Sequence, residues 1–355
     1  MTETNEVDAK HKLDEAKLTA FMRDRVEGYE GPLTVKQFAG GQSNPTYRLD
    51  TPTASYVLRR KPPGQLVRSA HAVDREFRVI QALYDTEFPV PKVYALCEDD
   101  SVLGTTFYIM ECVDGRIFWN FQMPELSPRE RGAALMSMID NLAKLHMLDY
   151  KSLGLEDFGR PGNYFSRQIS LWTKQFEHSP AVGLPNVDNL IAWLPSAIPE
   201  DDAVSLVHGD YSIHNLLFHP TKPKLEAALD WELSTIGHPL ADLFYSAMPY
   251  YSPDPTGTSE RSFLNLDCVQ HGIPTLDQYL QAYCEHTGRV SIKNPSFYKA
   301  FTLFRIAGIL HGIVGRIEGG TANDPNADRE NYRTQVQHLT DAAWDFARDA
   351  GASDD

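Results

Sequence analysis

The side chains best suited to chemistry lie in a short polar segment between two apolar runs. His208, Asp210 and Asn215 lie in this segment, and a later apolar run, residues 225–229, ends at Asp230. Polar groups between buried runs occupy a loop at a cleft, where they cost stability and so suggest a function. Two carboxylates and an amide are the oxygen ligands that Mg²⁺ prefers alongside substrate phosphates. We therefore expect Asn215 and Asp230 to complement magnesium while Asp210 meets an acceptor hydroxyl.

The same residues admit other chemistry. His208, Asp210, His214 and Asp230 together could ligate two metal ions and hydrolyse a phosphate ester. Such a centre needs further ligands at strand ends, and the remaining histidines are scattered along the chain. A single loop aspartate is also a common turn former. A dimetal phosphoesterase is thus the weaker hypothesis.

The residues before this segment predict a small sheet with one helix. Apolar alternation and turn residues predict strands, and a helical period with two following prolines predicts the helix. We expect an α+β lobe, residues 33–113, after an N-terminal helical extension, residues 1–32. The strands are predicted at residues 33–38, 46–49, 56–59, 93–96 and 106–113, and the helix at 71–84.

After Gly115 the pattern changes to helices, which predicts a larger, mostly helical lobe over residues 114–355. Capping boxes begin one helix at Ser127 and another at Thr275, and these helices should end near Leu148 and Gly288. Residues 298–317 form a third predicted helix. Its apolar composition resembles that of a membrane span, but its four basic side chains make insertion costly, so a core helix is expected.

Composition limits the classes of partner. The 355 residues are 42% hydrophobic and 23% charged, as in an ordinary folded protein, and carry a formal charge of −15. That charge argues against nucleic acid or an anionic membrane as a partner and is compatible with a cationic substrate. The polar N-terminus lacks a signal sequence, which predicts a cytoplasmic protein. Four separate cysteines make disulfides and structural zinc unexpected.

The spacing of the polar residues resembles that of a known family. The pattern His208-x-Asp210-x-x-x-x-Asn215, followed by Asp230 and by residues 237–243, is similar to the aminoglycoside phosphotransferase and choline kinase family, distant relatives of protein kinases. The resemblance extends over residues 33–320. Residues 56–64 and 69–76 look closest to kinase-like domains related to those fused to acyl-CoA dehydrogenases. The resemblance implies a bilobal protein-kinase-like fold, with a five-stranded antiparallel sheet and one helix in the small lobe. It also implies that the protein uses ATP and Mg²⁺.

The resemblance also implies roles for the loop residues. Asp210 would orient the acceptor hydroxyl and take its proton, while Asn215 and Asp230 would hold magnesium. His208 would fix the loop, and Asp242 would hydrogen-bond it from the following helix. We expect the side chains at 210, 215 and 230 to converge at the mouth of a crevice.

In the small lobe, the resemblance implies three groups of nucleotide-binding residues. Arg59 stands where the family has a phosphate-binding lysine, with Glu76 as its ion-pair partner; Arg60 and Lys61 are open alternatives. Backbone groups of the last strand and hinge would bind the adenine edge. The phosphate-covering loop would be Gly40, Gly41, Gln42, Ser43 and Asn44, and the hinge would be Glu111, Cys112 and Val113.

The expected partner is a small molecule with a hydroxyl, either a hydroxyacyl thioester or an amino alcohol such as an aminoglycoside. Residues 304–316 form a candidate wall of the acceptor site, where Arg305 and Arg316 either meet an anionic group or pair internally. A catalytically inactive nucleotide-binding scaffold is an alternative hypothesis. The feature that supports it is the arginine at position 59, in place of the family's lysine. Oligomeric state and preference for ATP over GTP stay open.

Overall fold

A computed structural model describes residues 4–39, 44–62, 72–178, 184–254, 260–320 and 328–353. The chain divides into two compact units, and neither is continuous in sequence. The first comprises Met1–Phe118, Tyr150–Leu155 and His214–Ser234. The second comprises Trp119–Asp149, Glu156–Ile213 and Thr235–Asp355. The chain therefore passes from the second unit to the first within the segment that contains Asp210 and Asn215.

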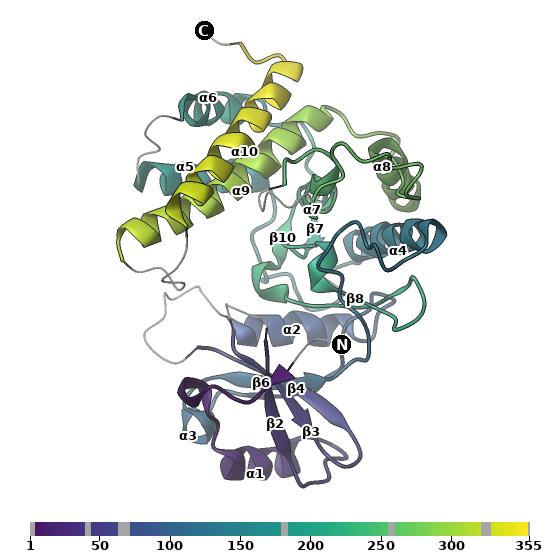
Figure 1. Ribbon diagram of the computed structural model, residues 1–355, viewed down its shortest axis with the longest axis vertical. Helices are drawn as coiled ribbons and strands as arrows, with labels where there is room; N and C mark the ends of the chain where they lie inside the picture. Colours follow the sequence, from purple (N-terminus) through teal and green to yellow (C-terminus); the bar gives the residue numbers. More distant parts are fainter. Residues whose placement is uncertain are drawn as a thin grey trace. The chain divides into compact units, whose positions relative to one another are not determined.

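The first unit is built on an antiparallel sheet with strand order β1-β2-β3-β4-β6-β5, which confirms the predicted α+β class (Figure 1). The sheet has six strands rather than the predicted five, because Thr4 and Asn5 pair with Phe38 and Gln37. A two-residue strand is too short to show an alternating pattern in the sequence. The strands are β1 (Thr4–Asn5), β2 (Thr34–Phe38), β3 (Thr46–Asp50), β4 (Ser55–Arg60), β5 (Val93–Cys97) and β6 (Phe107–Glu111), and the helices are α1 (Glu15–Arg25), α2 (Val73–Leu83) and α3 (Asp100–Leu103).

The two faces of this sheet differ in chemistry. Side chains alternate between faces along a strand, and directly opposed residues share a face. Tyr47, Leu49 and Leu58 are buried on one face, in a core that includes residues of α1. Arg48 opposes Val57 and Thr46 opposes Arg59, so both arginines lie on the other face. Figure 1 shows α1 and α2 on opposite sides of the sheet.

A later segment, His214–Ser234, completes the first unit. Strands β8 (Leu216–Phe218) and β9 (Leu225–Ala228) form an antiparallel hairpin there, flanked by the 3₁₀ turns Ile213–Asn215 and Trp231–Leu233. The Leu229 N–H donates to the carbonyl of Asn215 at 2.9 Å. Asn215 and Asp230, the two predicted magnesium ligands, thus lie at the same end of this hairpin.

The second unit is mostly helical, as predicted. Both predicted capping boxes are present, at Ser127 and at Thr275, and the second helix ends at Gly288 in the left-handed conformation. The pair β7 and β10 lies antiparallel among the helices. The elements are α4 (Pro128–Met147), α5 (Tyr164–His178), α6 (Pro185–Trp193), β7 (Ser205–Val207), β10 (Thr235–Gly237), α7 (Pro239–Ser246), α8 (Leu276–Thr287), α9 (Pro295–Glu318) and α10 (Arg329–Asp349).

Helix α9 is the long apolar helix of the second unit. It begins at Pro295, before the predicted start, because the Asn294 side chain caps it by accepting from the Phe297 N–H. Within the described ranges, it alone has the length and composition to cross a membrane, but 61% of its most apolar window is buried inside the protein. A core helix has the same composition, so this is weak support for a membrane span.

Candidate active site

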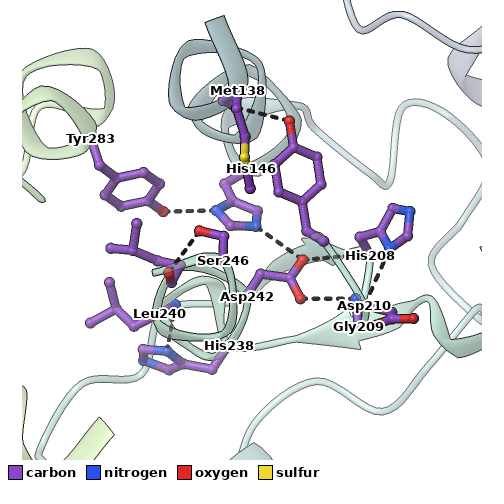
Figure 2. A network of polar contacts seen from close by, with 12 residues as sticks. Met138, His146, His208, Gly209, Asp210, His238, Leu240, Asp242, Ser246 and Tyr283 are labelled. Atoms are coloured by element: carbon purple, nitrogen blue, oxygen red, sulfur yellow. Dashed lines mark hydrogen bonds and ion pairs between the residues drawn. The ribbon is translucent and has the colours of Figure 1, made fainter. Parts of the chain in front are cut away.

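The loop after β7 carries the predicted catalytic residue, Asp210, and Asp242 of α7 anchors it. The Asp242 carboxylate accepts hydrogen bonds from the backbone N–H groups of His208, at 2.5 Å, and Gly209, at 2.8 Å (Figure 2). Gly209 has a φ of 83°, a conformation that side-chain-bearing residues rarely adopt. The predicted structural role of Asp242 is therefore confirmed.

A buried chain of polar groups stands behind Asp242. Its carboxylate lies 3.5 Å from Nε2 of His146, whose Nδ1 lies 2.8 Å from the Tyr283 hydroxyl (Figure 2). Burial alone raises the pKa of Asp242, but the hydrogen bond and charge of His146 and the Gly209 N–H outweigh it and hold the pKa below its usual value. The carboxylate is thus ionised at neutral pH, and α4, α7 and α8 together fix the loop.

His208 has a structural role as well. Its ring is fully buried, and Nδ1 accepts a hydrogen bond from the Asp210 N–H at 3.3 Å. The next residue, Tyr211, donates its hydroxyl to the carbonyl of Met138 in α4 at 2.8 Å. These bonds place Asp210, which is half-buried, on a segment held from both sides.

Two residues that the sequence did not single out as neighbours of Asp210 contact this loop. Tyr245 of α7 hydrogen-bonds Asp210, and burial together with that carboxylate raises the pKa of Tyr245 well above its usual value. Arg305 of α9 donates from Nη2 to the carbonyl of Gly209 at 2.7 Å and covers the Tyr245 ring at 5.3 Å. Tyr245 follows Asp242 by three residues, so the helical period could have placed both on one face.

The contacts of Arg305 also bear on the acceptor hypothesis. Internal pairing with a carboxylate was one of the two expected roles of this arginine. Among the described residues it forms no ion pair, although its side chain is buried. Its polar partner is instead the backbone carbonyl of Gly209, in the loop that carries Asp210.

The predicted ion pair between Arg59 and Glu76 is confirmed in the first unit. Nε of Arg59 lies 2.8 Å from Oε2 of Glu76, and Glu76 also accepts from the backbone N–H of Trp231 at 3.1 Å. Nη2 of Arg59 reaches Oδ1 of Asp230 at 2.5 Å. One arginine thus connects β4, α2 and the predicted magnesium ligand. Asp230 itself has a φ of 63°, which is uncommon for a residue other than glycine and occurs often at functional sites.

The structure also distinguishes the three adjacent basic residues. Arg60 lies on the opposite face of β4, with its guanidinium 5.6 Å from the centroid of the Tyr47 ring. Lys61 pairs with Asp74 at 2.9 Å. Arg59 is therefore the one of the three that is directed to Asp230.

Glu232 is a third carboxylate near Arg59, and sequence reasoning missed it. Its Oε2 lies 3.9 Å from Nη2 of Arg59 and accepts a hydrogen bond from Nδ2 of Asn44 at 3.1 Å. Burial lowers the pKa of Arg59, but Glu76, Asp230 and Glu232 together raise it above its usual value. Burial raises the pKa of Glu76, and the positive charge of Arg59 offsets only part of this increase. The position of Glu232, two residues after Asp230, was the signal in the sequence that could have identified it.

The donor set of the first unit suits magnesium. Three carboxylates surround one guanidinium, and this excess of negative charge favours a further cation. Asn215 and Asp230 supply hard oxygen donors at the same end of the β8–β9 hairpin. No group of three or more His, Cys, Asp or Glu residues suited to a metal occurs in the described part of the chain. Magnesium needs no such cage, because it takes few protein carboxylates and completes its shell with phosphate and water.

The remaining predicted nucleotide-binding residues are described only in part. Gly40, Gly41, Gln42 and Ser43 lie outside the described residues. At the hinge, Cys112 and Val113 line a cavity. The backbone N–H groups of Glu111 and Cys112 already donate, to the carbonyls of Lys92 at 2.8 Å and Ser55 at 3.4 Å. The ligand-binding roles of these residues, and the convergence of Asp210 with Asn215 and Asp230, stay predictions.

Known proteins resemble this chain over most of its length. A family model described as the phosphotransferase enzyme family matches residues 34–292. A crystal structure from Ralstonia eutropha JMP134, provisionally assigned as an aminoglycoside phosphotransferase, is 45% identical, with a TM-score of 0.87 over 95% of this chain and 99% of that one. Choline kinase from Cryptosporidium parvum shares the fold alone, at 14% identity and a TM-score of 0.64 over 96% of this chain and 98% of that one.

Two curated relatives are longer proteins. Acyl-CoA dehydrogenase family member 10 of Mus musculus is 42% identical over 90% of this chain and 30% of its own length. Acyl-CoA dehydrogenase family member 11 of Homo sapiens is 39% identical over 97% of this chain and 44% of its own length. The chain thus spans less than half of either relative.

Proposed function

Because the chain belongs to the phosphotransferase enzyme family, we propose that it is a kinase that transfers the γ-phosphate of ATP to a small-molecule hydroxyl. The observation that carries this proposal is the arrangement around Arg59. A guanidinium held by Glu76 lies against the carboxylate of Asp230, so a phosphate-binding cation and a magnesium-type ligand occur together. Phosphoryl transfer needs such positioning and charge neutralisation more than covalent chemistry.

In this proposal each of the site residues has a distinct role. Magnesium, held by Asn215 and Asp230, would neutralise the phosphate charge. Arg59 would bind phosphate oxygens as a planar cation with donors on two edges. Asp210, on a loop anchored by Asp242, would accept the proton of the acceptor hydroxyl and orient that hydroxyl.

The acceptor is proposed to be either a hydroxyacyl thioester or an amino alcohol such as an aminoglycoside. The names of the acyl-CoA dehydrogenase relatives support the first class. Solved structures with the same fold contain spectinomycin or hygromycin B, which supports the second. The formal charge of −15 also suits a cationic acceptor.

The proposal is tested by phosphate transfer from γ-labelled Mg-ATP to a panel of both acceptor classes, with water as the default acceptor. We expect transfer to at least one acceptor, and we expect Asp210→Asn to lower kcat by about 10²- to 10⁴-fold, the usual contribution of a positioned base. Asp140→Asn removes a carboxylate paired with Lys144 on α4 and should leave kcat unchanged.

Other outcomes would favour the alternatives. Binding of Mg-ATP with no transfer to any acceptor or to water would indicate an inactive scaffold. Hydrolysis of a generic phosphate ester in the absence of ATP, abolished by chelators, would indicate a phosphoesterase. Equal activity of Asp210→Asn and the wild type would contradict the proposed role of this aspartate.

A further inference from the structure

The first unit contains a cavity of about 520 Å³ where β6 ends. Cys112 and Val113 line it, together with Phe38 and Arg48 from the sheet and Leu217 from the β8–β9 hairpin. Its volume lies within the ~300–1,000 Å³ range of small-molecule pockets. Arg48 is the one basic side chain among the described residues that line it. The rest of the lining is mixed, with the polar side chains of Thr51, Thr53, Ser55 and Asp114 beside the apolar ones, so the contacts of Arg48 decide what this pocket can bind.

Arg48 is held along one edge of its guanidinium. Nε donates to both carboxylate oxygens of Asp50, at 2.8 and 3.1 Å, and Nη2 donates to the Ser55 hydroxyl at 3.1 Å. Ser55 in turn donates to Asp50 at 2.6 Å. Nη1 makes no hydrogen bond to any described residue, and the side chain is 36% exposed. A planar group with a fixed edge and free donors thus borders the cavity.

The charge of Arg48 is already balanced. Burial raises the pKa of Asp50, but hydrogen bonds from Ser55 and Arg48 outweigh it and lower the pKa, so this carboxylate is ionised at neutral pH. Asp114, which also lines the cavity, adds a second carboxylate nearby. A neutralised guanidinium is a poor phosphate site but a good partner for an aromatic ring, on whose face it stacks.

The sheet places Arg48 and Arg59 at a spacing that suits one ligand. Arg48 opposes Val57, and Arg59 follows Val57 by two residues on the same face. Two residues along a strand span about 7 Å. A nucleotide with its phosphates at Arg59 and Asp230 would then be long enough to bring its base to the cavity. We propose that Arg48 binds the nucleobase through its guanidinium, an inference that rests on the kinase function proposed above.

Equilibrium binding of two ligands tests this inference: Mg-ATP, and Mg-tripolyphosphate, which lacks the base and ribose. Both are measured by calorimetry on the full chain, for the wild type and for Arg48→Met. We expect about tenfold weaker binding of Mg-ATP and no change for Mg-tripolyphosphate, because one cation–π contact or hydrogen bond is lost at the base. The double variant Arg48→Met/Asp50→Asn, which restores the charge balance, should behave in the same way.

Lys36→Met is the matched control. Lys36 opposes Arg48 on the same face, but it does not line the cavity, and its loss changes the net charge equally. It should bind Mg-ATP as the wild type does. An equal loss for both ligands, or unchanged Mg-ATP binding by folded Arg48→Met, would overturn the role of Arg48 and leave the kinase function standing. Failure of the wild type to bind either ligand would overturn both.

Discussion

Arg59 lies where the family resemblance implies a lysine, at the proposed phosphate site. The related kinases are expected to have a lysine here, which is a compact point charge, whereas arginine offers a rigid fork of donors. In this chain the fork bridges two carboxylates at once: Nε lies against Glu76 and Nη2 against Asp230. A lysine could contact one of them well but not both in the same geometry.

The variant Arg59→Lys should therefore bind nucleotide poorly. We expect the KM for Mg-ATP to rise about tenfold, the cost of roughly one charged hydrogen bond. Arg59→Met should raise it further and also lower the stability, because the buried Glu76 loses its partner. Steady-state kinetics and urea unfolding measure both effects.

Arg60→Lys is the control for this pair of variants. Arg60 lies on the opposite face of β4, against Tyr47, and should not affect the KM for Mg-ATP. A normal KM for Arg59→Lys, at unchanged stability, would show that Arg59 does not contact the nucleotide.

At the scale of elements, α7 organises the loop that carries Asp210. It presents Asp242 to the backbone of His208 and Gly209, and Tyr245 to the side chain of Asp210. Helix α9 adds Arg305 at the Gly209 carbonyl. Helices thus hold three backbone groups of the loop, and Tyr245 adds a contact to the Asp210 carboxylate itself.

Replacing the anchor should reduce the stability in a pH-dependent way. Asp242→Asn retains the shape but weakens two charge-assisted hydrogen bonds, so we expect a loss of about 2–3 kcal/mol in the free energy of unfolding at pH 7. The folded-state pKa of Asp242 is depressed, so its contribution is full above the unfolded value of about 3.9 and is lost as the pH falls through the folded pKa.

Urea unfolding at a series of pH values measures this difference. The gap between the wild type and Asp242→Asn should be constant near neutrality and close below about pH 4. Asp345→Asn, at an exposed position on α10, is the control and should show no such gap. A gap that stayed constant down to the most acid pH would mean that the ionised form of Asp242 does not stabilise the fold.

At the scale of the whole molecule, ligand binding should increase the free energy of unfolding. The first unit carries Arg59 on one segment and Asp230 and Glu232 on another far away in the sequence, so a nucleotide that binds at both segments stabilises the folded state over the unfolded one. At a ligand concentration of about 100 times Kd, the gain is about 2.7 kcal/mol. We expect the thermal unfolding midpoint to rise with Mg-ATP.

The magnesium dependence of that rise identifies the metal ligand. Asp230→Asn should abolish the additional stabilisation that Mg²⁺ gives over ATP alone, while Asp140→Asn should retain it. Scanning calorimetry with ATP in the presence of magnesium or of a chelator separates the two contributions. The same magnesium increment in Asp230→Asn would remove this residue from the metal site.

Local sequence patterns determined much of this protein. The capping boxes at Ser127 and Thr275, the alternation in β2 to β6 and the break after α2 all depend on residues near one another in the chain, so they could be predicted. The loop that contains Asp210 and Asn215 was identified in the same way, with its family roles implied by resemblance. The two-residue strand β1 was not predicted, because two residues are too few to show a local pattern.

Only the tertiary structure decided which side chains meet. The family resemblance implied the pair of Arg59 with Glu76, but the contact of Arg59 with Asp230 joins two segments far apart in the sequence and was not predicted. The same holds for Glu232 with Asn44, and for Arg305 with Gly209. Hydrogen bonds and ion pairs act over a few ångströms of space regardless of chain separation, so residue spacing alone cannot reveal them.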